Sequence, residues 1–316
     1  MANLIITNYC NLRCPYCFAK EAVMDGFTPV NMTLEQVATI LDFVKTSPYG
    51  KRIAIIGGEP TLHPQVREIC EYVHENLPAD GKMSIFSNGV HLEKVLDLLC
   101  SDFNCLINFN HPDDCGIDNY NKTCENLKKA VEMGKFPYIS VGINLYPGMP
   151  GYDYLFDLKR NGTFNFTHIR VSTVAPANQI KYKDRDVYYT ESKQPFLEVL
   201  KLCEEYNFEV KIDCNHIPSC YFTPEELELC ERVCGSAVKR TCLPTIDIDS
   251  NYNALRCFGK PDINANLFDY ETFDDLVKAF QENVKCQLLE KLPQECKQCK
   301  YGKFGACKGG CLSFLS

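Results

Sequence analysis

The sequence lacks any hydrophobic run long enough to cross a membrane. No stretch of 18 apolar residues occurs in the 316-residue chain, whereas a transmembrane helix needs about 20. A membrane role is therefore not expected. Hydrophobic residues make up 45% of the chain and charged residues 23%, which is typical of a globular protein that buries a sizeable core.

Positive charge is also scarce. The 41 Asp and Glu residues outnumber the 33 Lys and Arg residues, which gives a formal net charge of −8, and the basic residues are scattered along the chain. Neutralising nucleic-acid phosphates requires clustered Lys and Arg. General nucleic-acid binding is therefore not expected.

A secretory signal is missing too, because the first expected strand begins at Leu4. The 20 cysteines are thus not interpreted as a disulfide framework, which belongs to small secreted domains. We expect a cytoplasmic protein in which some thiolates bind metal and others pack as small buried hydrophobes. The second group is expected to comprise Cys70, Cys100, Cys105, Cys115, Cys124 and Cys203.

Short β-branched runs alternate with helical patterns from residue 4 to about residue 213, which is typical of βα units around a parallel sheet. Six units are too few to close an eight-stranded barrel, so the predicted fold is α/β with a partial, open (β/α)6 barrel. Ligands of such folds bind at the C-terminal ends of the strands. Strands are expected at 4–7, 52–56, 83–87, 105–108, 138–145 and 168–172, and helices at 33–45, 64–76, 92–99, 120–133 and 191–206.

The character of the chain changes after Asp213. The remaining residues are dense in cysteine and contain one long helical pattern, at 272–289. We therefore predict two domains, the partial barrel at 1–213 and a cysteine-rich domain at 214–316.

A loop of three closely spaced cysteines follows the first strand. Cys10, Cys14 and Cys17 form a C-x3-C-x2-C pattern. Three thiolates can bind three irons of a [4Fe–4S] cluster and leave the fourth iron without a protein ligand. That iron can chelate the amino and carboxylate groups of S-adenosylmethionine. The alternative is a structural zinc site, which usually has four protein ligands.

With Tyr16 and Phe18 on either side of its last cysteine, this loop resembles that of the radical SAM superfamily. The resemblance implies that the cluster cleaves S-adenosylmethionine reductively, and that the resulting 5′-deoxyadenosyl radical abstracts hydrogen from a substrate. It also implies that the Tyr16 position lies near the adenine.

The segment IAIIGGEPTLHP is similar to a second motif of the same family, which binds the methionyl amino group. Its motif residues are Gly57, Gly58, Glu59 and Pro60. A Gly-Gly pair at a strand end exposes backbone where Cβ atoms would obstruct a ligand. On its own, such a pair is more often only a turn.

Further cofactor contacts are implied by the family with less specificity. Ser87 and Asn88 end the third strand where family members often contact the methionine carboxylate, and Asn144 ends the fifth strand near the expected ribose. Ordinary strand-end turns also favour Ser and Asn. No catalytic base is assigned, although the strand-end residues His111, Tyr146, Asp213 and His216 are open candidates.

The final run ECKQCKYGKFGACKGGC has the pattern C-x2-C-x7-C-x3-C, and Cys242 stands fifteen positions before Cys257. This region resembles the SPASM or shorter twitch extensions of radical SAM enzymes, which carry auxiliary iron–sulfur clusters. It departs from the SPASM pattern in three ways. Seven residues separate Cys299 from Cys307 where five are usual, Tyr252 stands where Gly is usual, and the eighth cysteine is not found before Ser316. We expect one or two auxiliary [4Fe–4S] clusters, and one or two zinc ions are the alternative. The expected ligands are Cys242, Cys257, Cys296, Cys299, Cys307 and Cys311, with Cys220 and Cys234 in reserve.

Such extensions commonly accompany modification of a peptide by crosslinking, epimerisation or oxidation, so a peptide is the first expected substrate. The alternative substrate is a small molecule such as an aminocyclitol or sugar. This alternative is favoured by the N-terminal segment, because only nine residues precede Cys10 and a fused leader-peptide recognition domain is therefore not expected. A separate recognition protein and a low-potential donor such as flavodoxin or ferredoxin are possible partners. A non-catalytic iron–sulfur or zinc protein is a third hypothesis, which the GGEP motif disfavours.

Overall fold

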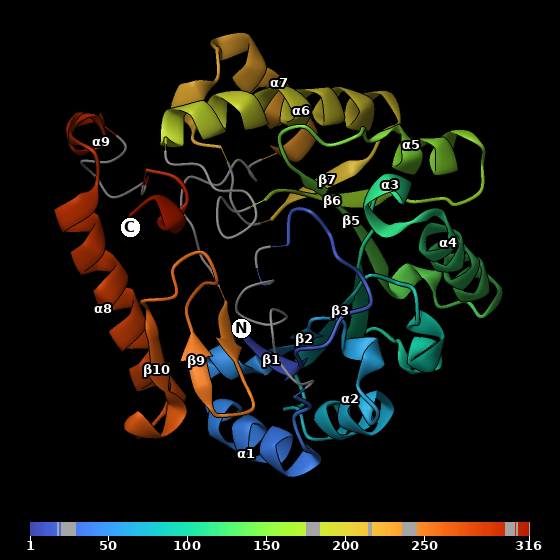
Figure 1. Cartoon of the computed structure of the whole chain (residues 1–316), viewed down its shortest axis with the longest axis vertical. Helices are drawn as coiled ribbons and strands as arrows, with labels where there is room; N and C mark the ends of the chain where they lie inside the picture. The colour runs from blue at the N-terminus through green and yellow to red at the C-terminus, as the bar shows by residue number, and fades with distance from the viewer. Residues whose placement is uncertain are drawn as a thin grey trace.

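The computed structural model describes residues 1–17, 19, 30–174, 184–213, 217–235, 245–300, 307 and 309–315. Within these ranges the strands form one ten-stranded sheet in the order β10-β9-β8-β1-β2-β3-β4-β5-β6-β7. Strands β1 to β7 are mutually parallel and follow one another in sequence order. The predicted α/β class with a parallel, open barrel is confirmed, and Figure 1 shows the sheet curving with helices α1, α2, α4, α5 and α6 on its outer side.

The parallel strands alternate between an outer face packed under the helices and an inner face that carries many polar side chains. Ile85 and Ile107 are fully buried on the outer face, because successive side chains of a strand point to opposite faces. The strands are β1 Ala2–Thr7, β2 Arg52–Gly57, β3 Lys82–Ser87, β4 Phe103–Asn108, β5 Ile139–Leu145, β6 His168–Thr173 and β7 Glu209–Ile212.

Helix α1 (Leu34–Val44) illustrates how the crossover helices form. Thr33 and Gln36 make a capping box at its start, and Val37, Ile40 and Val44 are buried at helical spacing. The other barrel helices are α2 Val66–Glu75, α3 Pro112–Cys115, α4 Ile117–Glu132, α5 Asp153–Arg160 and α6 Arg185–Glu205.

The helix predicted at 92–99 was wrong, because the segment forms two short 3-10 turns, at Leu92–Lys94 and Leu96–Leu98. Its apolar residues are buried all the same, Leu92 and Val95 completely, so the hydrophobic spacing reports burial and not the helix type. Strand β7 and helix α5 were not predicted.

The C-terminal region extends the same sheet from its other edge. Strand β8 (Ile246–Ile248) pairs parallel to β1, and β9 (Asn253–Leu255) and β10 (Asn264–Asn266) follow antiparallel. Whether residues 214–316 form a separate domain stays a prediction. The remaining helices are α7 Pro224–Cys234, α8 Phe273–Lys291 and α9 Gln294–Gln298. None of the helices in the described ranges is long and apolar enough to span a membrane.

Candidate functional site

The three-cysteine loop lies at the C-terminal end of β1, where the fold predicts a ligand site. The backbone N–H of Leu12 donates to the Cys10 sulfur at 3.4 Å, and the Cys17 N–H donates to the Cys14 carbonyl at 3.2 Å. Burial, together with the neighbouring thiols of the loop, raises the pKa of Cys10 to about 11 and that of Cys14 to about 12. Thiols that resist ionisation on their own suit a cationic metal centre, which holds them as thiolates.

The glycine-rich end of β2 is hydrogen-bonded directly to this loop. The Gly58 N–H donates to the Thr7 carbonyl and the Glu59 N–H to the Tyr9 carbonyl, both at 2.8 Å. A Cβ atom on Gly58 would lie 2.4 Å from the Tyr9 oxygen. The close approach therefore requires glycine, and it fixes the start of the cysteine loop against the second motif.

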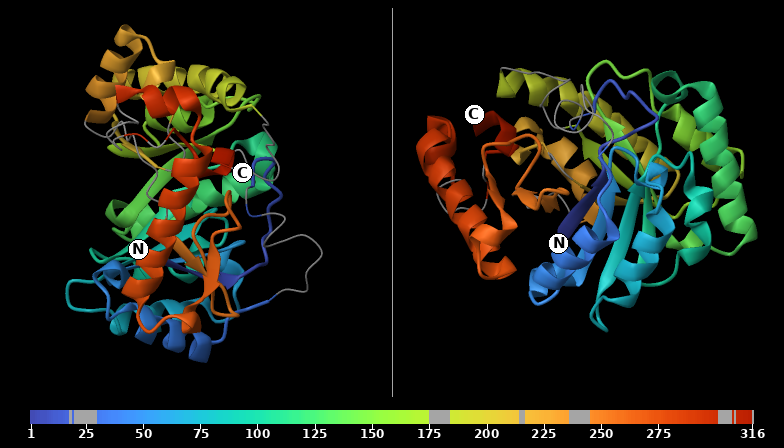
Figure 2. Two further views of the ribbon diagram at one scale, coloured as in Figure 1. Left: turned by 90° about the vertical axis from the view of Figure 1, so that its left-hand side faces the viewer. Right: turned by 60° about the horizontal axis from the view of Figure 1, so that its bottom comes forward.

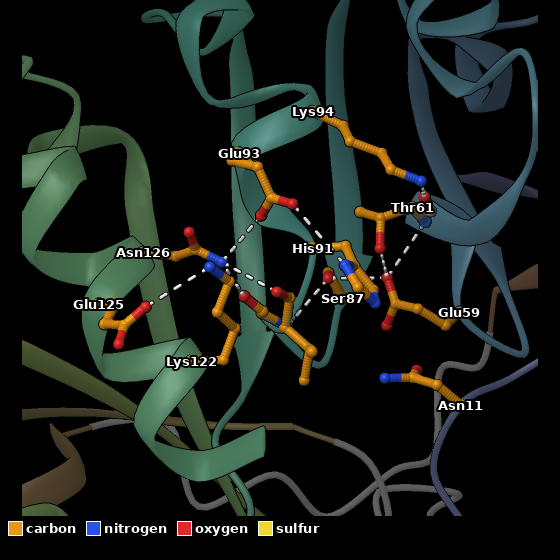
Figure 3. A network of polar contacts seen from close by, with 12 residues as sticks. Asn11, Glu59, Thr61, Ser87, His91, Glu93, Lys94, Lys122, Glu125 and Asn126 are labelled. Carbon is orange, nitrogen blue, oxygen red and sulfur yellow. Dashed lines mark hydrogen bonds and ion pairs between the residues drawn. The ribbon is translucent and has the colours of Figure 1, made fainter. Parts of the chain in front are cut away.

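The carboxylate of Glu59 is a buried hydrogen-bonding centre. One oxygen accepts from the Thr61 N–H at 3.1 Å, the Thr61 hydroxyl at 2.6 Å and the Ser87 hydroxyl at 2.8 Å, and the other accepts from the Asn88 N–H at 2.7 Å. Only 1% of Glu59 is exposed. Figure 3 shows the side chains of Thr61 and Ser87 converging on the Glu59 carboxylate. Glu59 therefore holds the ends of β2 and β3 together. The sequence analysis did not identify Thr61 as a hydrogen-bond donor to Glu59.

Asn88 then connects the end of β3 to the cysteine loop, since its amide donates to the Asn11 side chain at 2.9 Å. Behind it, the buried Asn126 amide on α4 donates to the carbonyls of Gly89 and Val90. A small pocket beside this contact is lined by Leu12, Asn88, Val90, Phe109, Asn110 and Thr123, among others. The predicted residues Gly58, Glu59, Ser87 and Asn88 thus meet around the loop.

Tyr16 leans from the loop onto the ends of β4 and β5. Its hydroxyl donates to Asn110, and its ring lies 5.0 Å from the ring of Tyr146. Asn144, at the end of β5, also contacts the Tyr16 hydroxyl and accepts from Ser172 at 2.5 Å. The predicted Tyr16 and Asn144 therefore lie together, whereas Phe18 lies outside the described residues.

Among the candidate bases, Tyr146 and Asp213 are both engaged. The Tyr146 hydroxyl donates to both carboxylate oxygens of Asp114 at 2.8 Å, and burial raises the pKa of Asp114. Asp213 pairs with Arg170 at 2.6 Å. His111 caps the short helix α3 by accepting from the Asp113 N–H. His216 lies outside the described residues.

Two sets of neighbouring C-terminal cysteines can be recognised in the described residues. In the first, burial and the neighbouring Cys311 raise the pKa of Cys257 to about 12. Cys220 has Cys307 and Cys296 as its thiol neighbours. Cys299 directly follows α9, and Cys242 lies outside the described residues.

Cys234 is the exception, because it packs in the hydrophobic core beside Cys230 and Cys203. The structure does not bring it together with the other predicted C-terminal ligands.

Comparison with known proteins gives this geometry its context. Residues 4–154, which contain the cysteine loop, the GGEP turn and the end of β3, match the Radical SAM superfamily. These residues form a radical SAM domain. Members of this superfamily use a [4Fe–4S] cluster and S-adenosylmethionine, and they need a substrate and a reductant.

The curated relatives match less than half of the chain. A GTP 3′,8-cyclase of Streptomyces coelicolor is 29% identical over 152 residues, which are 46% of this chain and 44% of the relative. An S-adenosylmethionine-dependent nucleotide dehydratase of Selenomonas ruminantium is 40% identical over 87 residues, 28% of this chain and 29% of the relative. The chain therefore spans less than half the length of these relatives.

One solved structure resembles nearly the whole radical SAM chain. SuiB of Streptococcus suis, determined bound to S-adenosylmethionine, matches 99% of this chain and 72% of its own, with a TM-score of 0.67 and 16% identity. At this identity the likeness concerns the fold, and it extends through the cysteine-rich C-terminal region.

Proposed function

We propose that this radical SAM protein modifies a peptide by abstracting a hydrogen atom from it. The observation that carries the radical step is the hydrogen-bonded unit of the cysteine loop and the GGEP turn, in which Glu59 donates to Tyr9 and Gly58 donates to Thr7. When bound, the cluster and S-adenosylmethionine supply the 5′-deoxyadenosyl radical.

The chain's own residues shape the site in which this chemistry takes place. Cys10, Cys14 and Cys17 would hold three irons, and the backbone of the Gly57–Pro60 turn and the end of β3 would orient the methionine moiety. Tyr16 and Asn144 would contact the nucleoside part. Because Glu59 is saturated by four donors, its carboxylate serves to fix this geometry.

Auxiliary iron–sulfur clusters in the C-terminal region are the second part of the proposal. The gathering of Cys257 with Cys311, and of Cys220 with Cys296 and Cys307, supports thiolate sites near the barrel. An auxiliary cluster held there would supply an acceptor for the electron left on a substrate radical. The extension's resemblance to those of peptide-modifying enzymes favours a peptide substrate, and the likeness to SuiB over almost the full chain concerns the fold that carries this extension.

A small-molecule substrate is the second candidate. It is favoured by the names of the curated relatives, which are a GTP cyclase and a nucleotide dehydratase. Those matches cover less than half of this chain and less than half of each relative, so they bear weakly on the substrate.

The substrate proposal is tested by adding candidate substrates to the reconstituted, reduced enzyme with S-adenosylmethionine. Short peptides encoded beside the gene are compared with GTP and other nucleotides. The proposal predicts that one peptide raises the rate of 5′-deoxyadenosine formation and changes mass, and that deuterium at its modified carbon is transferred to 5′-deoxyadenosine. Stimulation and label transfer with a nucleotide, and with none of the peptides, would overturn the peptide assignment but not the radical step.

A further inference from the structure

The first turn of α6 faces the cysteine-rich end of the chain. Arg185, its first residue, places Nη1 3.3 Å from the sulfur of Cys296, and Nη2 lies 3.0 Å from Oε1 of Glu295. Only 16% of the Arg185 side chain is exposed. A largely buried guanidinium therefore directs an N–H group at a cysteine that the sequence predicts as a metal ligand.

The same helix holds the following cysteine segment. The Cys311 N–H donates to the hydroxyl of Tyr189, one turn along α6 from Arg185, at 2.6 Å. A Cβ atom on Gly309 would lie 3.8 Å from Arg185 Nη1 and 3.6 Å from the Cys296 sulfur. Figure 2 shows the end of the chain, in red, beside the start of α6. The backbone of Gly309 thus lies over the Arg185–Cys296 contact.

A third segment brings another thiol to this place. The ring of Tyr221 lies 5.0 Å from that of Tyr189, and its hydroxyl donates to Asp186, the second residue of α6. Cys307 and Cys296 raise the pKa of Cys220, which is adjacent to Tyr221, and Arg185 lowers it. Cys220 and Cys296 are 76 residues apart in the sequence, yet both thus lie within electrostatic reach of Arg185 at the start of α6, and Cys307 lies within electrostatic reach of Cys220.

We propose that Arg185 is a positioning residue of an auxiliary iron–sulfur site formed by these three cysteines. Its N–H group donates to the Cys296 sulfur and raises the reduction potential of the cluster. Reduction adds one negative charge, and a hydrogen bond to a ligating sulfur together with a nearby cation stabilises that charge. This inference rests on the proposed function, which supplies the auxiliary cluster.

Two ion pairs argue that the contact is held in place and is not an incidental surface contact. Arg185 is anchored by Glu295, which precedes Cys296 in the chain, and by Asp186 at 3.3 Å. The guanidinium is therefore fixed in orientation while one N–H remains directed at sulfur. A merely structural arginine would stabilise the fold without changing the potential of a cluster.

The test uses protein in which Cys10, Cys14 and Cys17 are replaced by Ala, so that any remaining iron belongs to auxiliary sites. Arg185→Met is compared with Arg232→Met. The second variant removes an exposed arginine of α7 that pairs with Glu204 of α6 at 2.9 Å. The reduction potential is measured by potentiometric titration followed by electron paramagnetic resonance. We expect Arg185→Met to lower the reduction potential by about 59 mV or more, which is a tenfold change in the one-electron reduction equilibrium. Arg232→Met should leave the potential unchanged.

Two further variants keep the test decisive if Arg185→Met folds poorly. Glu295→Gln removes a negative charge beside the cluster and should raise the potential. Cys220→Ser should lower the iron content or convert the cluster to a three-iron form, whereas Cys286→Ser, on the exposed face of α8, should not. Unchanged potentials in both charge variants, unchanged iron in Cys220→Ser, or zinc in place of iron would overturn the inference. Cleavage of S-adenosylmethionine by the wild-type enzyme tests the radical step independently of these results.

Discussion

The backbone N–H of Asn88 donates to the carboxylate of Glu59 at 2.7 Å, and this hydrogen bond joins the ends of two neighbouring strands. The other Glu59 oxygen accepts from Ser87 and Thr61. Because the Asn88 side chain contacts Asn11 in the cysteine loop, the geometry of the proposed methionine site depends on a buried carboxylate that need not touch the cofactor.

Replacing Glu59 by Gln should destabilise the protein by about 1–3 kcal/mol, because one acceptor becomes an NH2 group facing an N–H or O–H donor in a buried site. Urea unfolding measures the loss. Glu93→Gln is the matched control, since Glu93 is about a third exposed, accepts from Asn126 at 3.0 Å and lies 3.7 Å from His91, and it should change stability by about 0.5 kcal/mol or less. Equal losses in the two variants would contradict a special role for Glu59.

Gly58→Ala should displace the cysteine loop, because its Cβ would lie 2.4 Å from the Tyr9 carbonyl oxygen. We expect the reconstituted variant to lose roughly four irons per chain, the content of one [4Fe–4S] cluster. Gly134→Ala controls for general strain, since Gly134 has a φ of +67° but nothing within 4 Å of the added carbon. That variant should lose about 1 kcal/mol of stability and no iron. Full iron loading of Gly58→Ala would refute the coupling of the two motifs.

Asp247, in β8, should make stability depend on pH. Burial raises its pKa from 3.8 to about 7, although Asn3 donates to its carboxylate at 2.6 Å. The folded chain therefore binds a proton more tightly than the unfolded chain, and stability should fall as the pH rises from about 4 to 7.

Asp247→Asn removes this titration. The free energy of unfolding of the variant minus that of wild type should be roughly 2 kcal/mol larger at pH 8 than at pH 5. Urea unfolding of both proteins at the two pH values measures this difference. Taking the difference between the two pH values cancels the change in hydrogen bonding at Asn3. A difference that is the same at both pH values would show that Asp247 titrates normally.

Tyr252 occupies a position where the SPASM pattern has glycine, and its φ of +63° explains the preference. Its ring packs on Phe268 at 4.9 Å. Tyr252→Gly and Tyr252→Ala both lose this packing, but only glycine adopts a left-handed backbone without strain. The Gly variant should therefore be more stable than the Ala variant by about 1 kcal/mol in thermal or urea unfolding. The reverse order would exclude a left-handed backbone here.

Local sequence patterns predicted the repeated parts of the fold well. The capping box at Thr33 and the β-branched runs that form β2 and β6 are readable because a helix start and a buried strand depend mainly on neighbouring residues. The segment 92–99 was misread, since its spacing suits burial in either an α-helix or 3-10 turns. Strand β8 joins β1 across more than 240 residues of sequence, a pairing that no local pattern specifies.

The site was predictable where a motif fixes neighbouring residues, as in the cysteine loop and the GGEP turn. Thr61, Asn11 and Arg185 were missed, because their importance comes from contacts between distant segments. Thr61 follows the GGEP motif by one residue, and a buried glutamate that needs donors was the one signal that could have drawn attention to it.

We propose that Cys10, Cys14 and Cys17 hold a cluster that cleaves S-adenosylmethionine. Wild type and a variant with all three cysteines replaced by Ala are reconstituted anaerobically with iron and sulfide, and the iron per chain is counted. Dithionite and S-adenosylmethionine are then added, and the 5′-deoxyadenosine formed is assayed. We predict cleavage by wild type, none by the variant, and about four or more irons remaining in the variant if an auxiliary cluster is present. Absence of cleavage by wild type, with zinc in place of iron, would contradict the account.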